Sequence, residues 1–291
     1  MTQTPSDLRG EAEALAGPLP PLLADAEHLA ATVMLGEHGR RRPGVGDEFW
    51  QYRPAQPSDE ARLVDWRRSA RSDQHFIRER EWQASQTVLI WVDGAQSMQF
   101  ASKSVQPKVD RARSLAMAVA ILLLRGGERV GLTGLTTPPR IGEVQLLRLA
   151  AGLLNDSGAG DFGAPDITGM LPKSRALFVS DFLGPLDQVE AALTQAADRG
   201  VRGAMLMVLD PEEEAFPYDG RTVFESMGGG ITHETQQAGG LRDRYLERLA
   251  ERKDRLISLA RLTGWQFHCH HTGESAQSAL LWLYRAMEQT R

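Results

Sequence analysis

The sequence is poor in several features that would indicate a function. Its 291 residues include one cysteine, Cys269, so no internal disulfide can form and a reducing, cytoplasmic setting is expected. The net charge of −5 is too small to favour nucleic acid or an acidic membrane as a partner. The longest apolar stretch, residues 115–124, is far shorter than the roughly 20 residues of a membrane span. Residues 1–10 lack the apolar segment of a signal peptide.

Sequence motifs of common enzymes are also missing. There is no Walker A loop, no Gly-x-Ser-x-Gly and no dinucleotide fingerprint, and the three glycines at 228–230 precede no helix-start lysine. The run Glu212–Glu214 beside Pro211 is expected to be a solvated turn. We therefore predict a protein that is not an enzyme.

Apolar patterning from residue 75 onward predicts alternating strands and helices. The expected strands are 75–82, 87–92, 129–133, 176–181, 201–209 and 265–270, and the expected helices are 108–125, 142–154, 186–197, 241–262 and 275–288. Such alternation is typical of an α/β fold, with a doubly wound, mainly parallel sheet flanked by helices.

The chain before residue 75 is less regular. Residues 1–21 are rich in Pro, Gly and Ala and are expected to be mobile at the start, whereas 21–35 have helical apolar spacing. A short helix is expected around 59–66, capped by Ser58 or Asp59. We predict two parts: residues 1–74, an N-terminal helix and an irregular Arg/Trp-rich segment on the core, and residues 75–291, the α/β domain.

Two long stretches are expected to be loops. Residues 155–166 are glycine-rich and without a period, and residues 211–240 are loop-like with a hairpin near 221–226.

Three of the predicted strands run directly into a carboxylate. Asp93, Asp181 and Asp210 follow apolar runs, and Ser97 adds a hydroxyl nearby. The carboxyl ends of parallel strands meet at one edge of a sheet, where ligands bind in open α/β folds. Oxygen ligands of this kind suit Mg²⁺, Mn²⁺ or Ca²⁺. The alternative is that these carboxylates cap helices or bind main-chain amides.

The loop from Asp93 to Ser97 resembles the first ion-binding loop of von Willebrand A domains, whose pattern is Asp-x-Ser-x-Ser. The resemblance implies a divalent cation such as Mg²⁺, held by Asp93, Ser97 and Asp181, with Thr168 as the best candidate for a missing threonine loop. Ala95 stands where that pattern has its middle serine. The implied ion site is therefore a degenerate one.

An upstream element carries a second resemblance. Its residues are Arg53, Asp59, Arg62, Asp65, Trp66, Ser69, Arg71 and Glu79. Together with the Ser180–Phe182 turn they resemble the signature of bacterial domain-of-unknown-function family fifty-eight, a von Willebrand A-like group. The resemblance implies a soluble adaptor that works with a MoxR-type AAA+ ATPase in protein maturation or complex assembly. Two alternatives stay open: a Mg-dependent hydrolase using the sheet-edge carboxylates, and a purely structural subunit.

The Arg/Trp-rich element has two interpretations of its own. Trp, Tyr and Arg dominate binding hot spots, which favours a recognition surface. Alternatively, Trp66 packs into the sheet while Arg62, Arg71 and Asp65 form ion pairs that hold an irregular segment. We favour this structural interpretation for Trp66 and Asp65.

A cluster of possible metal ligands occurs at residues 268–271. On a strand, His268 and His270 would share one face and Cys269 the other. No third ligand for the histidine pair is evident. We expect a strand-end cluster without a function.

Overall fold

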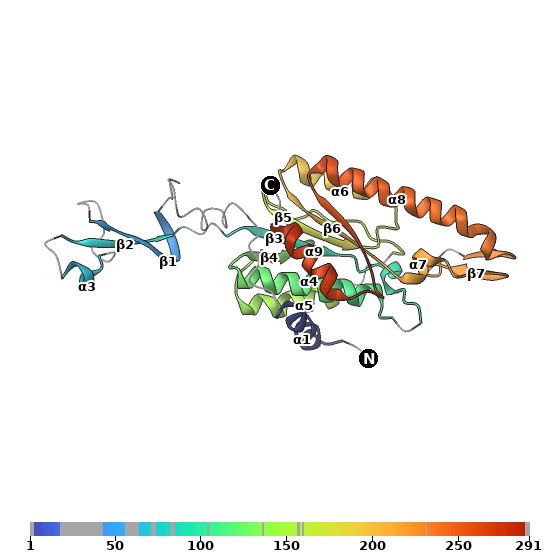
Figure 1. Ribbon diagram of the computed structural model, residues 1–291, viewed down its shortest axis with the longest axis horizontal. Coiled ribbons are helices and arrows are strands. Elements are labelled where there is room, and N and C mark those ends of the chain that lie inside the picture. Colours follow the sequence, from blue (N-terminus) through green and yellow to red (C-terminus); the bar gives the residue numbers. More distant parts are fainter. Residues whose placement is uncertain are drawn as a thin grey trace. The chain divides into compact units, whose positions relative to one another are not determined.

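The computed structural model describes two units of the chain (Figure 1). The described residues are 3–17, 43–55, 64–70, 74–81, 85–103, 105–135, 137–155, 158, 160–230 and 232–288, with only the main chain described at 43–53 and 78–81. The larger unit joins Met1–Ala26 to Gln86–Arg291, and the smaller unit is Glu27–Ser85. The predicted boundary after residue 74 falls within the smaller unit. The helix predicted at 21–35 lies outside the described residues.

The larger unit is built on a five-stranded sheet in which all neighbouring strands are parallel. The strands are β4 (Arg129–Leu132), β3 (Thr87–Val92), β5 (Arg175–Ser180), β6 (Arg202–Leu209) and β9 (Gln266–His271), in that spatial order. The side chains of the three central strands β3, β5 and β6 are mostly apolar and almost all buried, because helices cover both faces of the sheet. The predicted doubly wound α/β fold is confirmed.

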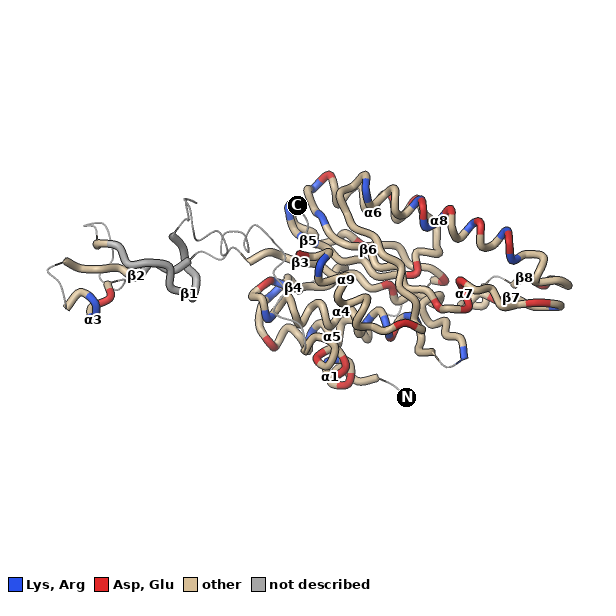
Figure 2. Tube along the Cα trace, viewed as in Figure 1, with Lys and Arg blue, Asp and Glu red and all other residues tan. Residues whose placement is uncertain are grey.

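Helices lie on both sides of this sheet, as Figure 1 shows. One face is covered by α4 (Lys108–Arg125), α5 (Glu143–Asn155) and α9 (Ala276–Glu288), with α1 (Pro5–Ala16) packed on α4. The other face is covered by α6 (Leu186–Asp198) and α8 (Arg242–Thr263). Positively and negatively charged residues both recur along α8 (Figure 2). Among the helices described, none has the length and apolarity that crossing a membrane requires.

The helix α1 was not predicted, because the start of residues 1–21 was expected to be mobile. Thr4 caps it in a capping box with Asp7, and Pro5 occupies the first turn. Leu8, Ala12 and Ala16, spaced four apart, are fully buried. Alanine-rich composition had suggested a tail, but the same small side chains allow a close helix–helix contact with α4.

Between β6 and α8 the chain is more ordered than predicted. A short helix, α7 (Pro211–Ala215), replaces the start of the expected loop, and a hairpin follows with strands β7 (Thr222–Glu225) and β8 (Thr232–Thr235). The hairpin predicted near 221–226 is confirmed. The described part of the larger unit also contains two short 3₁₀ helices, η2 (Gln96–Gln99) and η3 (Ala238–Leu241).

The smaller unit contains an antiparallel pair, β1 (Pro43–Pro54) and β2 (Phe76–Glu81), and a one-turn helix, α3 (Trp66–Ser69). The strand predicted at 75–82 is confirmed, but it pairs with β1 rather than with the main sheet. β1 was not predicted, because its charged sequence has no period and it forms by pairing with β2. The helix predicted over 59–66 is wrong where it is described: Val64 bridges Ile77 as a strand residue, and Asp65 caps α3.

Candidate functional site

The candidate site lies where the direction of the sheet connections reverses. From β3 the chain crosses to β4 on one side, and from β5 it crosses to β6 on the other. Ligands of open α/β sheets bind outside the carboxyl ends of the strands at such a switch point. Asp93 follows β3, and Ser180 and Asp181 lie at the end of β5. The sequence-based prediction that Asp93 and Asp181 meet at one sheet edge is consistent with this register.

Asp93 is almost completely buried and fully hydrogen-bonded within the protein. Its Oδ2 accepts from Ser180 Oγ at 2.7 Å, and its Oδ1 accepts from the Ala95 amide at 2.9 Å. The Gly163 amide also bonds this carboxyl. Burial raises the pKa of Asp93, although these hydrogen bonds oppose the shift. A side chain at Gly163 would collide with the carboxylate, since a Cβ there would lie 2.1 Å from Oδ1.

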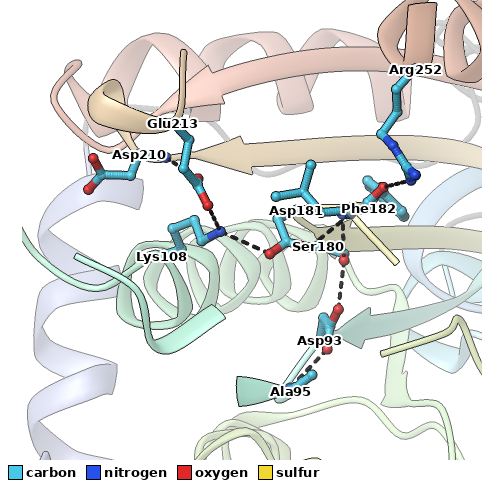
Figure 3. A network of polar contacts seen from close by, with 10 residues as sticks. Asp93, Ala95, Lys108, Ser180, Asp181, Phe182, Asp210, Glu213 and Arg252 are labelled. Carbon is cyan, nitrogen blue, oxygen red and sulfur yellow. Dashed lines mark hydrogen bonds and ion pairs between the residues drawn. The ribbon is translucent and has the colours of Figure 1, made fainter. Parts of the chain in front are cut away.

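Lys108, the first residue of α4, places a buried ammonium group at the same edge. Its Nζ donates to Asp181 Oδ2 at 2.9 Å and to Glu213 Oε1 at 2.6 Å (Figure 3). Burial alone would lower the pKa of Lys108, but Asp181 and Glu213 outweigh it and the pKa is raised. Burial raises the pKa of Glu213, partly offset by the nearby ammonium. Lys108 is thus a charged internal partner for two carboxylates.

The third strand-end carboxylate, Asp210, has a structural role as the N-terminal cap of α7. Its Oδ1 accepts from the Glu212 amide at 2.9 Å and caps α7, while Oδ2 accepts from the Ser102 amide at 2.8 Å. In return Glu213 Oε2 accepts from the Asp210 amide at 2.8 Å, which completes a capping box. The capping interpretation of the strand-end aspartates therefore holds for Asp210.

The turn after β5 is fixed from α8. Asp181 Oδ1 accepts from the Leu183 amide at 3.0 Å, and Arg252 donates from one nitrogen to the carbonyl oxygens of Phe182 and Gly184, each at 2.7 Å. Phe182 has a left-handed backbone with φ of 48°. These bonds hold a strained turn in which Asp181 faces Lys108 (Figure 3).

The Asp93–Ser97 loop is covered by another segment of main chain. The amides of Gln96 and Ser97 donate to the carbonyl oxygens of Gly160 and Asp161, and the Gly158 amide donates to Gly94. Ser97 Oγ and Asp161 Oδ1 are buried and have no hydrogen-bond partner among the described residues. This covering segment belongs to the loop predicted at 155–166.

Thr168 is separate from this arrangement. Its side chain is exposed, and its amide donates to Asp166 Oδ1 at 2.8 Å. Within the described part of the chain it makes no hydrogen bond to Asp93, Ser97 or Asp181. The structure thus connects Asp93 with Ser180, and Asp181 with Lys108, but does not connect Thr168 with either pair.

The residues present do not fit an open divalent-cation site. Mg²⁺ requires near-octahedral oxygen ligands at about 2.0–2.1 Å. Both oxygens of Asp93 and both of Asp181 already accept internal hydrogen bonds, and the Lys108 ammonium 2.9 Å from Asp181 would repel a second cation. Among the described residues near this loop, the unpaired Ser97 Oγ and Asp161 Oδ1 are the oxygens that would suit such an ion. The magnesium expectation stays a prediction without support from this geometry.

Lys108, Glu213 and Arg252 were missed in the sequence. One signal was available: Asp210-Pro211-x-Glu213 has the residues of a capping box with proline at the first helical position. The expectation of a solvated turn at Glu212–Glu214 is wrong for Glu213, which is mostly buried against Lys108.

The Arg/Trp-rich element is described in part. Asp65 caps α3 by accepting from the Arg68 amide at 3.1 Å, and Ser69 Oγ accepts from the Phe76 amide at 2.9 Å. Within the smaller unit Trp66 is 58% exposed and meets the edge of His75, and the expectation that it packs into the main sheet stays a prediction. Arg62 and Arg71 lie outside the described residues. Arg53 and Glu79 are placed only as strand residues of β1 and β2.

The fold and site define a doubly wound α/β protein with internally bonded carboxylates at its switch point. Residues 51–255 match the family described as "Protein of unknown function DUF58", and the chain belongs to that family. The uncharacterized proteins Rv1480 of Mycobacterium tuberculosis and Mb1516 of Mycobacterium bovis are each 28% identical over 257 residues, covering 83% of this chain and 80% of theirs.

Solved structures resemble the chain more weakly. The conserved hypothetical protein BatB from Bacteroides thetaiotaomicron is 14% identical with a TM-score of 0.37, and an aerotolerance-related membrane protein from Bacteroides fragilis is 12% identical with a TM-score of 0.39. Each match covers 70% of this chain and 98% of the other. At these scores the likeness carries no functional argument.

Proposed function

We propose that the protein is a non-enzymatic adaptor that binds other proteins and works with a MoxR-type AAA+ ATPase in protein maturation or complex assembly. The observation that carries this proposal is a group of exposed apolar side chains on α5 and its flanks. This α5 patch consists of Ile141, Val144 and Leu147, which are 61%, 67% and 47% exposed. Grouped exposed apolar side chains mark protein-binding surfaces more often than isolated ones do.

The members of the α5 patch belong to one region of the larger unit. Val144 and Leu147 are three residues apart and so share a face of α5, and Ile141 lies just before the helix. Leu135, which is 47% exposed, lies against the other end of α5, because a Cβ at Gly152 would lie 3.1 Å from Leu135 Cδ1. A cavity of about 410 Å³ adjoins Leu135 at the carboxyl ends of β3 and β4.

The carboxylate chemistry favours binding over hydrolysis. A hydrolase of the alternative kind needs a free carboxylate base or a metal-activated water. Asp93, Asp181 and Asp210 instead accept hydrogen bonds from within the protein. We infer that Lys108 takes the place of a divalent cation at the sheet edge, so that partner binding does not depend on Mg²⁺. The MoxR-type partner is the one that the family resemblance implies.

Binding to a purified MoxR-type ATPase of the same organism, measured by biolayer interferometry, tests the proposal. The double variant Val144→Asp, Leu147→Asp should weaken binding at least tenfold, about 1.4 kcal/mol, because it introduces charge into an apolar interface. Leu262→Asp is the matched control: Leu262 is 86% exposed on α8, on the opposite face of the sheet, and its variant should bind normally.

Two outcomes would contradict the proposal. If the wild-type chain does not bind the ATPase, the adaptor role with this partner fails. If both variants bind as the wild type does, the α5 patch is not the contact surface. Circular dichroism of each variant confirms that the fold is retained.

A further inference from the structure

The edge strand β9 separates its four consecutive cysteine and histidine side chains onto two faces. His268 stacks on Trp282 of α9 with ring centroids 4.8 Å apart, and His270 Nε2 lies 3.0 Å from an Arg111 nitrogen on α4. Cys269 instead packs with the apolar cluster on the α8 face. Side chains alternate along a strand, so His271 shares the face of Cys269. The two side chains of this strand that can act together as metal ligands are therefore Cys269 and His271.

A third side chain reaches this pair from α7. α7 follows β6, whose last residue, Leu209, is the register partner of His271, so Glu214 is brought to the same end of the sheet. Glu214 Oε2 contacts His271 Nε2. One potential ligand atom from each of Glu214, Cys269 and His271 lies within 4.8 Å of the others, and all three residues are half-buried. No motif connects Glu214 to the other two in the sequence.

We propose that Glu214, Cys269 and His271 bind a zinc ion. Thiolate, imidazole and carboxylate are the ligands that Zn²⁺ takes in proteins, at about 2.0–2.3 Å in a tetrahedral arrangement. Tetrahedral bonds of that length separate neighbouring ligand atoms by roughly 3.3–3.8 Å. The present separations of at most 4.8 Å reach this range with small side-chain rotations. Three protein ligands leave the fourth position to water.

Neighbouring side chains hold the proposed ligands in ligating orientations. A metal-binding histidine usually donates its second ring nitrogen to a carboxylate, and His271 Nδ1 lies 3.4 Å from Glu274 Oε1. Lys253 Nζ donates to Glu214 Oε1 at 2.6 Å and leaves Oε2 directed at His271. A thiolate and a carboxylate also match the double charge of the ion.

The site has access to solvent. Cys269 and Lys253 line a surface cavity of about 550 Å³ between α8 and β9. Zinc can therefore reach the thiolate without opening of the fold. This proposal is independent of the adaptor function and of the sheet-edge carboxylates.

Cobalt(II) titration of the metal-free protein tests the site, because Co²⁺ occupies tetrahedral zinc sites and is coloured. One equivalent should produce a thiolate-to-cobalt charge-transfer band and the intense visible bands of four-coordinate cobalt, and Zn²⁺ should displace both. Cys269→Ser should abolish the charge-transfer band. His271→Gln and Glu214→Gln should each weaken binding at least about tenfold.

Two further variants make the test specific. Glu274→Gln should weaken binding about tenfold yet retain the charge-transfer band, because Glu274 positions His271 without touching the ion. His268→Gln, on the opposite face of β9, is the matched control and should bind as the wild type does. The proposal is overturned if the wild-type chain shows no charge-transfer band, or if His271→Gln and Glu214→Gln bind cobalt as tightly as His268→Gln. Circular dichroism of each variant checks that the fold is retained.

Discussion

Lys108 illustrates how a buried charge can determine the character of a site. Removing an ammonium and two carboxylates from water is costly, and only close, well-oriented pairing offsets this cost. Asp181 and Glu213 supply that pairing at 2.9 and 2.6 Å, and the Phe100 ring lies 5.9 Å from the ammonium. The same cluster in a more open site would attract a metal ion. Here the positive charge that the two carboxylates require is supplied by the Lys108 ammonium instead of a metal ion.

Replacing Lys108 should therefore destabilise the fold strongly. Lys108→Met leaves Asp181 buried and without its counter-charge, and we expect a loss of about 3–5 kcal/mol in the free energy of unfolding. Urea denaturation followed by circular dichroism measures this loss. The double variant Lys108→Met, Asp181→Asn should recover part of it because the unpaired charge is gone. A single-variant loss below about 1 kcal/mol would mean that the cluster is not a buried ion pair.

Asp93 offers a contrasting prediction, because burial disfavours its charged form, whereas the charged form of Lys108 is favoured by its partners. Asp93→Asn can still accept from the Ala95 amide and bond Ser180, whereas Asp93→Ala leaves buried donors unpaired at about 1–3 kcal/mol each. Burial raises the pKa of Asp93 above 3.8 in the folded chain. The wild type therefore loses stability as the pH rises through that raised pKa, since a carboxylate must then be buried.

The asparagine variant escapes this pH-dependent loss. Relative to the wild type, Asp93→Asn should gain stability as the pH rises from about 4 toward 7, and Asp93→Ala should be less stable than Asp93→Asn throughout. Urea denaturation at a series of pH values measures both trends. A stability difference between Asp93→Asn and wild type that does not vary with pH would contradict the assigned burial effect.

Which of these residues could be predicted from the sequence depends on the range of their contacts. Asp93 and Asp181 end apolar strands, a local signal, and parallel strands place such ends at one edge. Lys108 had no local signal, because its partners are 73 and 105 residues away. Cys269 and His271 stood out as possible ligands in the sequence, but Glu214, which lies on another element, did not. Local patterns locate strand ends, while side-chain partners depend on packing.

At the scale of elements, pairing and packing account for the incorrect predictions. β1 has no apolar alternation and exists because β2 provides its hydrogen bonds. α1 has weak amphipathic character, yet Leu8, Ala12 and Ala16 are buried completely. The long helices α4 and α8 were predictable because their apolar side chains repeat at the helical period, and the central strands of the sheet because they are short apolar runs between helices.

The packing of α1 can be tested by two substitutions with opposite effects. Leu8→Ala should cost about 2–5 kcal/mol by leaving a cavity against α4. Gly10→Ala should stabilise by about 0.5–1 kcal/mol, because a Cβ at this mid-helix position meets nothing within 4 Å. Thermal and urea unfolding measure both. If neither substitution changes stability, α1 does not contribute to the folded unit.

At the scale of the whole molecule, the larger unit is discontinuous in sequence. Glu27–Ser85 lies between α1 and β3 and forms a unit of its own. Alternating strands and helices predicted the α/β architecture of the larger unit, and the Asp65–Ser69 stretch predicted the family. The boundaries of the two units could not be predicted from apolar patterns. α1 belongs to the larger unit only through contacts with α4, α5 and α9, which follow the inserted segment in the sequence.

This discontinuity has a consequence for folding during synthesis. Glu11 on α1 and Ser114 on α4 are joined by a hydrogen bond although they are 103 positions apart. Because the ribosome delivers the N-terminal part first, α1 emerges long before α4, and its contacts with α9 form only when the C-terminal helix has been made. Its small apolar face therefore stays uncovered until α4 has been made. The packing of α1 is complete only when α9 has also joined it.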